Sequence, residues 1–185
     1  MNIAVLTAEG NVVVRPDTTR IKDSEDAYLP DFVDKVDWAP VVYTRVTKPG
    51  KSVALRFASR YFSTFGVGAL LYPHYTEGGS AQDYARSLCL DRTSALNLQT
   101  CEDTPGPADI AVLRDGNAIF ALSTDISHLL EGAVSEVTRY CSIRTGDLLA
   151  VELQPCESLC RRGDAVPLLS GTVNGQERIK LKVVL

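Results

Sequence analysis

One stretch, residues 36–75, constrains the fold more than any other part of the sequence. It begins with segment 38–47, which is rich in β-branched and aromatic residues and therefore favours a half-buried strand. A proline-glycine pair at 49–50 then predicts a turn. Ser52 stands where the N-cap of a helix belongs, and Gly66 where the glycine after its last turn belongs. The stretch therefore predicts a strand, a turn and a capped helix.

The predicted helix spans 52–65 and carries one apolar face. Apolar residues recur at every fourth position, and two arginines lie off this stripe. The stripe consists of Val53, Phe57, Tyr61 and Phe65. After Gly66, the apolar segment 68–72 predicts an interior strand. We expect this strand–helix–strand unit to form the centre of the fold.

Two hairpins are predicted outside this unit. Segments 1–6 and 11–14 flank a turn at the start of the sequence. Segments 110–114 and 117–122 flank an Asp-Gly pair, which is the strongest hairpin signal in the chain. A short extended piece is expected at 28–30.

A second main helix is expected over 125–141, with Ser123 and Asp125 as alternative N-caps. Its apolar face is formed by Leu129, Leu130, Ala133, Val134, Val137 and Cys141. Segment 76–86 predicts a flexible Gly-Gly stretch followed by a short helix.

Charge and hydropathy exclude several classes of protein. The net charge of −4 and the pI near 5.2 give no general attraction for nucleic acid or for an anionic membrane. The apolar runs are too short to span a bilayer, and the first residues lack a basic segment followed by a long apolar one. We therefore expect a cytoplasmic protein that has no nucleic-acid or membrane partner.

The five cysteines do not predict a disulfide framework, because their number is odd and their spacing irregular. Reduced thiols of a cytoplasmic protein fit this pattern. Cys156 and Cys160 could instead form a redox or metal pair, although the sequence offers only two histidines and no second pair of this kind.

The central unit resembles the fumarylacetoacetate hydrolase superfamily. In that family a strand with two acids is followed by a Gly-Lys-x-Ile turn, a helix ending in Arg-Tyr, and a Val-Gly-Ile-Asp strand. The segments DWAPVV, PGKSV, RFASRYF and VGALL occupy the same order here. Segment 142–149 likewise resembles the family's Thr-Leu-x-x-Gly-Asp-Leu-Ile, and 163–183 resembles its last two strands.

This resemblance covers roughly residues 12–185 and implies the fold. It predicts a mostly-β α+β domain, built as a rolled, mixed sheet of the fumarylacetoacetate hydrolase type with two main helices. Since no repeat or linker divides the chain, we expect residues 1–185 to form one domain. The family also implies association, so a homodimer is expected.

The resemblance further implies a metal site that this sequence has lost. Family members bind a divalent cation, usually Mg²⁺, through carboxylates, and the cation stabilises an enolate while a C–C bond breaks. Counted back from Gly50, the family's two glutamates fall on Ala39 and Val41, and its aspartate falls on Leu70. None of these side chains can coordinate a metal, so we expect no metal, no cofactor and no conventional catalytic residue.

Five other positions correspond to the family's pocket. Arg15 takes the place of a pocket lysine, although a solvated arginine at a strand end is an equally good interpretation. His74 and Tyr75 replace an arginine and an aspartate, and could form a new polar pocket floor. Leu88 replaces a lysine, and Glu152 begins the segment that replaces a Gly-Thr-Pro loop. The family's Asn-Tyr-x-x-His lid has no expected counterpart, because only a short segment precedes the first matched strand.

Three hypotheses for the function follow. The leading one is a non-catalytic homologue that acts through ligand binding or subunit association, with a small 2-oxo acid as one ligand. The second is an enzyme, a hydrolase, decarboxylase or isomerase of acylpyruvate-like acids, rebuilt without metal around Arg15, His74, Tyr75 and Glu152. The third is an inactive partner subunit of an active paralogue.

Overall fold

The structure is a computed structural model that describes residues 1–22, 25–75 and 81–185. The strands are β1 (Asn2–Leu6), β2 (Val12–Pro16), β3 (Ala27–Tyr28), β4 (Lys35–Arg45), β5 (Gly66–His74), β6 (Ser94–Ala95), β7 (Pro107–Arg114), β8 (Asn117–Asp125), β9 (Leu148–Glu152), β10 (Glu157–Arg161), β11 (Leu168–Val173) and β12 (Gln176–Val184). The helices are α1 (Ala81–Ser87), α2 (Ile126–Tyr140) and the 3₁₀ helices η1 (Asp17–Thr19), η2 (Leu55–Tyr61) and η3 (Leu98–Thr100).

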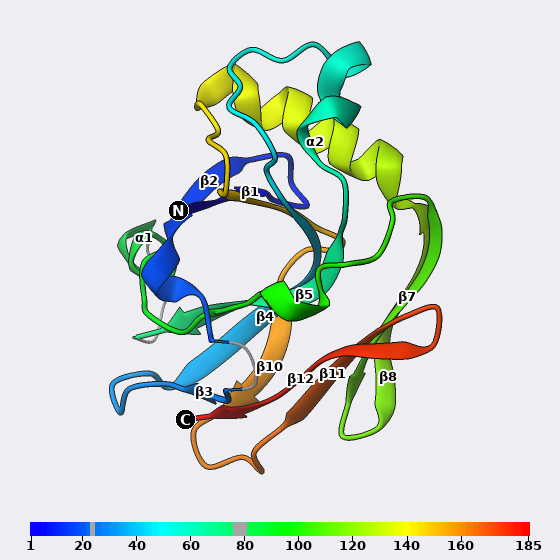
Figure 1. Ribbon diagram of the computed structural model, residues 1–185. Helices are drawn as coiled ribbons and strands as arrows, with labels where there is room; N and C mark the ends of the chain where they lie inside the picture. Colours follow the sequence, from blue (N-terminus) through cyan, green and yellow to red (C-terminus); the bar gives the residue numbers. More distant parts are fainter. Residues whose placement is uncertain (23–24, 76–80) are drawn as a thin grey trace.

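The larger sheet is mixed and rolled. Its strand order is β2-β1-β9-β4-β5-β6, and β10 pairs with the remaining part of β4. β1 and β9 run parallel, whereas the other pairs are antiparallel. The two ends of this order meet, because the N–H of Thr93 donates to the carbonyl of Thr19 (2.8 Å) and that of Ile21 to Ser94 (2.9 Å). The sheet therefore curls back on itself, as Figure 1 shows.

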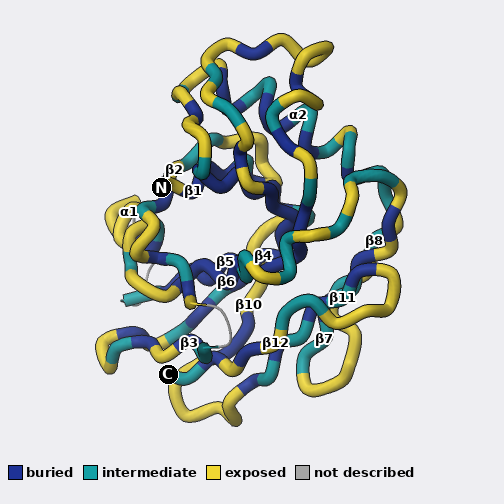
Figure 2. Tube along the Cα trace, viewed as in Figure 1, coloured by how far each residue is buried: buried dark blue, intermediate teal, exposed yellow. Residues whose placement is uncertain are grey.

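A second sheet, in the order β3-β12-β11-β7-β8, packs against the outer face of β4 and β5. The contact is apolar and includes Val36, Trp38, Ala69, Leu71, Val112, Leu169, Leu181 and Val183. Figure 2 shows that β1, β4 and β5 are buried along most of their length. The mostly-β, rolled and mixed architecture predicted from the sequence is thus confirmed.

Helix α2 covers another part of the outer face, across the top of the molecule in Figure 1. Asp125 is its N-cap, since its side chain accepts the N–H of Ser127 at 2.9 Å. Leu130, Ala133, Val134 and Val137 of the predicted apolar face are buried, while Leu129 and Cys141 pack at its margin. The position and the apolar face of this helix were therefore predicted correctly, and of the two predicted N-caps, Ser123 and Asp125, the structure has Asp125.

The other predicted helix was assigned wrongly. In place of an α-helix over 52–65 the chain forms the short 3₁₀ helix η2, and Ser52 has a φ of 53° rather than an N-cap conformation. A 3₁₀ helix has three residues per turn, so a spacing of four does not keep residues on one face. Accordingly Phe57 is 39% exposed, whereas Val53 and Phe65 are buried.

Gly66 has a different role from the one predicted, since it begins β5 instead of ending a helix. A Cβ atom at Gly66 would lie 2.6 Å from the ring of Tyr43, and one at Gly68 would lie 2.4 Å from the carbonyl of Ala95. Glycine is required here because neighbouring strands approach closely, not because a helix needs a left-handed end.

Both predicted hairpins are present. β1 pairs with β2, and β7 pairs with β8 through a turn in which Asp115 and Gly116 have φ values of 52° and 83°. These values are typical of a type I′ turn, which an Asp-Gly pair favours. The predicted short helix after the Gly-Gly stretch is α1, while residues 76–80 lie outside the described residues. In the described ranges, no helix combines the length and apolar character needed to cross a membrane.

We predict that Val134→Asp unfolds the protein while Phe57→Asp is tolerated. Val134 is fully buried between α2 and the sheet, so an aspartate there would be an unpaired buried charge that costs roughly 3–5 kcal/mol. Phe57 is partly exposed, so its replacement should cost only about 1 kcal/mol. Urea denaturation compares the two variants, and equal losses of unfolding free energy would contradict this packing.

Candidate functional site

The inner face of the rolled sheet is apolar at its centre. Ala39 on β4 lies directly opposite Leu70 on β5, and Val41 lies two residues further along β4 on the same face. All three side chains are fully buried. They belong to a cluster with Ile3, Val5, Tyr43, Tyr72, Leu96, Leu148 and Ala150. We call this cluster the inner apolar cluster.

The inner apolar cluster does not fit a divalent cation. Mg²⁺ and Ca²⁺ require several converging oxygen ligands, whereas Ala39, Val41 and Leu70 present only hydrocarbon. Within the described ranges, no group of three or more His, Cys, Asp or Glu side chains could hold a metal ion. The three positions named from the sequence therefore do lie together, and their side chains form a packed wall.

Arg15 on β2 lies beside this wall and is fully buried, so the interpretation as a solvated arginine is wrong. Its Nη1 donates to the carbonyls of Leu71 (3.2 Å) and Thr93 (3.3 Å) and lies 3.5 Å from the Ser94 hydroxyl oxygen. The guanidinium also stacks 4.4 Å from the ring centre of Tyr72. Arg15 therefore fastens β2 to β5 and to the start of β6.

Glu152, at the end of β9, completes a polar network with Tyr72. The Tyr72 hydroxyl donates to one carboxylate oxygen of Glu152, and the N–H of Ala8 donates to the other at 3.1 Å. Tyr84 of α1 stacks on the Tyr72 ring, with ring centres 6.2 Å apart and an interplanar angle of 3°. The structure thus brings two of the predicted residues, Arg15 and Glu152, to opposite parts of the same tyrosine.

Burial dominates the electrostatics of this network. It raises the pKa of Glu152 above its usual range, although hydrogen bonds from Tyr72 and Ala8 oppose the shift. It also raises the pKa of Tyr72 far above that of a free tyrosine. Desolvation and the nearby Glu152 and Glu9 carboxylates raise the pKa of Cys156 to about 12. A thiol with this pKa is protonated at neutral pH and is a poor nucleophile.

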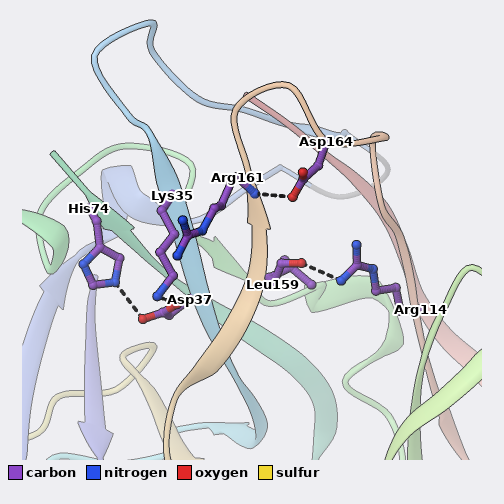
Figure 3. Close-up of polar contacts among 7 residues, drawn as sticks. All are labelled: Lys35, Asp37, His74, Arg114, Leu159, Arg161 and Asp164. Atoms are coloured by element: carbon purple, nitrogen blue, oxygen red, sulfur yellow. Dashed lines mark hydrogen bonds and ion pairs between the residues drawn. The ribbon is translucent and has the colours of Figure 1, made fainter. Parts of the chain in front are cut away.

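His74 lies on the same face as Tyr72, at the open end of β5. Its Nε2 is 2.7 Å from one carboxylate oxygen of Asp37, whose other oxygen pairs with Nζ of Lys35 at 2.8 Å. Figure 3 shows these three side chains converging between β4 and β5. The side chains of Lys35 and His74 are 30% and 33% exposed, so solvent reaches this group.

The remaining two predicted residues lie at the margins. Leu88, just after α1, packs against the inner apolar cluster. Tyr75 lies on the outer face of β4 and β5, where it packs against the apolar contact between the two sheets. The centre of its ring is 5.7 Å from that of Phe32. Since His74 and Tyr75 pack on different faces, they do not build a common pocket floor.

Sequence reasoning missed Tyr72, Tyr84 and Lys35. The alternation of side chains along a strand could have identified Lys35. It lies two residues before Asp37 and four before Ala39, so all three side chains are on one face of β4. The same rule places Tyr72 beside Leu70. No comparable signal exists for Tyr84, because its contact depends on how α1 docks against β5.

A groove of about 480 Å³ lies away from these residues, between β12 and the segment around η3. Charged side chains of both signs line it, including Glu25, Arg178 and Lys180. It contains none of the five pocket residues predicted from the sequence, so it does not mark the same site.

The fold is shared with proteins of the fumarylacetoacetate hydrolase family. A protein from Yersinia pestis assigned to that family has a TM-score of 0.72 at 13% identity, over 99% of this chain and 92% of its own. Fumarylpyruvate hydrolase from Pseudomonas aeruginosa, solved with Mn²⁺ and pyruvate, has a TM-score of 0.75 at 15% identity, over 100% of this chain and 90% of its own. A 2-hydroxyhepta-2,4-diene-1,7-dioate isomerase from Mycobacterium marinum has a TM-score of 0.73 at 14% identity, over 99% of this chain and 74% of its own. No family model and no curated protein matched the sequence.

We predict that Glu152→Gln gains stability relative to the wild type as the pH rises. The pKa of Glu152 is raised by burial, so the folded state holds this proton more tightly than the unfolded chain does. Protonated Glu152 therefore contributes its full share of the unfolding free energy at low pH. This contribution is lost as the pH rises through the folded-state pKa of Glu152. Glutamine keeps the shape without titrating.

The measurement is the difference in unfolding free energy between the two proteins at a series of pH values from about 4 to 8. We expect this difference to shift in favour of Glu152→Gln over that interval. A shift toward the wild type would mean that the folded state favours the charged carboxylate.

Proposed function

Taking the fold of the fumarylacetoacetate hydrolase family as its scaffold, we propose that this protein is a non-catalytic homologue that acts by binding a ligand or another subunit. One observation carries the proposal. Ala39, Val41 and Leu70, which correspond by sequence order to the family's metal-binding acids, are fully buried hydrocarbon on the inner face. A cation placed there would lose its hydration shell without gaining any protein ligand.

The substitutions also make physical sense for a scaffold without a metal. Three carboxylates on one buried face repel one another unless a cation lies among them. Aliphatic side chains remove that repulsion and pack with Ile3, Leu148 and Ala150. The same three aliphatic residues therefore both remove the metal ligands and fill the inner face.

A metal-free enzyme is the second candidate, supported by the contact between His74 and Asp37. A carboxylate that holds one ring nitrogen of a histidine orients the imidazole for proton transfer. However, two groups that would stabilise a developing enolate already have acceptors, because the Tyr72 hydroxyl donates to Glu152 and both terminal nitrogens of Arg15 donate to backbone carbonyls. The non-catalytic proposal therefore has the stronger support.

We predict that the protein neither binds Mg²⁺ or Mn²⁺ nor cleaves acylpyruvates or oxaloacetate. An enolate-forming C–C cleavage without its cation loses several kcal/mol of transition-state stabilisation, and about 1.4 kcal/mol is tenfold in rate. Calorimetric titration with each metal, and assays with and without it, test the statement. Metal-dependent turnover would contradict the proposal.

The triple variant Ala39→Glu, Val41→Glu, Leu70→Asp supplies the converse test. It should be less stable than the wild type without metal and should regain melting temperature when Mn²⁺ is added, because the ion relieves the repulsion. The matched control is Ala39→Gln, Val41→Gln, Leu70→Asn, which has similar volume and no charge. An equal response of both variants to Mn²⁺ would show that these three positions do not form a metal site.

Association with a second copy is part of the proposal, and strand β8 supports it. β8 lies at the edge of its sheet, carries no charged residue before Asp125, and exposes Ile119 by 37%. An uncharged edge strand is a template for pairing with another chain.

We predict that the wild type has a dimeric mass by light scattering at micromolar concentration and that Ile119→Lys has a monomeric mass. The control is Tyr140→Lys, a substitution at another exposed position, which should remain dimeric. A monomeric wild type would contradict it.

A further inference from the structure

Three basic side chains form a row across neighbouring strands at the open end of the rolled sheet. Arg161 on β10 lies directly opposite Lys35 on β4, and Lys35 lies directly opposite His74 on β5. Residues that oppose one another in antiparallel strands project from the same face. Figure 3 shows Arg161 and Lys35 side by side, with His74 beyond Lys35. We call these three residues the basic row.

The basic row is unfavourable for the sheet on its own. Like charges directly opposite each other destabilise a strand pair, and here an arginine, Arg161, lies directly opposite a lysine, Lys35. Asp37 offsets only part of this charge, since its two oxygens contact Lys35 and His74. The nearby Asp164 carboxylate accepts the backbone N–H of Arg161 at 2.8 Å, and no ion pair joins it to the Arg161 guanidinium among the described residues.

Arg161 is therefore the free member of the basic row. It is exposed, and no carboxylate in the described part of the chain lies within ion-pair distance of its guanidinium. A neighbouring arginine behaves differently, since Arg162 donates to the carbonyls of Pro30 (3.0 Å) and Val33 (2.8 Å). Of the two adjacent arginines, one holds a loop in place and the other is directed toward Lys35. A local arrangement that costs stability without structural benefit is typical of a functional site.

We propose that the basic row binds a small oxyanion with two negative charges. The Arg161 guanidinium can hold two oxygens at once in its planar fork, and the Lys35 ammonium adds a point charge beside it. Arg161 and Lys35 lie on neighbouring strands, whose backbones are about 4.8 Å apart, so one phosphate group or one short diacid placed between the two side chains can contact both. Asp37 fixes the positions of Lys35 and His74 and leaves Arg161 to provide the main contact.

This inference does not depend on the proposed function. The basic row lies on the inner face, and Lys35 is separated from Ala39 only by Asp37 along that side of β4. An anion bound there would lie at the solvent end of the inner apolar cluster, whether or not the protein performs any chemistry. A failure of the anion site would therefore leave the argument about the metal positions intact, and the reverse also holds.

The test compares Arg161→Gln with Arg139→Gln by calorimetry. Arg139 is an exposed arginine on α2 that pairs with Glu136 and lies over the ring of Tyr140. Both variants therefore remove one surface charge, and the control lies on a different element from the row. Inorganic phosphate and malonate are the two probes, and they distinguish a phosphate ligand from a diacid. We expect wild type and Arg139→Gln to bind one of them and Arg161→Gln to bind it roughly tenfold more weakly or not at all.

A second readout separates binding from a structural role. If the basic row exists for a ligand, Arg161→Gln without anion should melt at or above the wild-type temperature, because a like-charge pair has been removed. The anion should then raise the melting temperature of the wild type but not of this variant. Equal affinity of wild type and Arg161→Gln for both probes, no affinity in either protein, or a lower melting temperature of the anion-free variant would overturn the proposal.

Discussion

The rolled sheet depends on one buried cation. Arg15 extends from β2, at one end of the strand order, to carbonyl and hydroxyl oxygens of Leu71, Thr93 and Ser94 near the other end. Removing a guanidinium from water costs several kcal/mol, which these acceptors and the face of Tyr72 offset. Because the acceptors belong to β5 and to the residues around β6, the sheet must curl for the terminal nitrogens of Arg15 to reach them.

Closure of the sheet decides what the inner face can contain. Once β2 is fastened to β5, the side chains of Ala39, Val41 and Leu70 face other side chains and not solvent. Among the described residues, the ionisable groups named above lie where hydrogen bonds compensate them, as in the pair of Tyr72 and Glu152, or where the strands open to solvent, as at Lys35 and His74. The same roll therefore explains the apolar wall at the centre and the polar groups at its margins.

Much of this arrangement was readable from the sequence. Strand alternation and turn chemistry predicted the hairpins and the strands of the central unit, and the spacing of apolar residues predicted α2. The same spacing failed at η2, because the segment forms a 3₁₀ helix, in which a spacing of four does not keep residues on one face, and Phe57 is left partly exposed. Arg15 was ambiguous, since its burial depends on the distant residues Leu71 and Thr93. The basic row was missed because it requires the register of three strands.

The central claim is that the inner face between β4 and β5 is a packed hydrocarbon wall in place of a metal site. A crystal structure grown in millimolar Mn²⁺ and measured at the manganese edge tests it most directly, because anomalous scattering locates the ion independently of any model. We predict no anomalous peak beside Ala39, Val41 and Leu70, with these side chains in mutual contact. An ordered, octahedrally coordinated peak at that position would contradict the account.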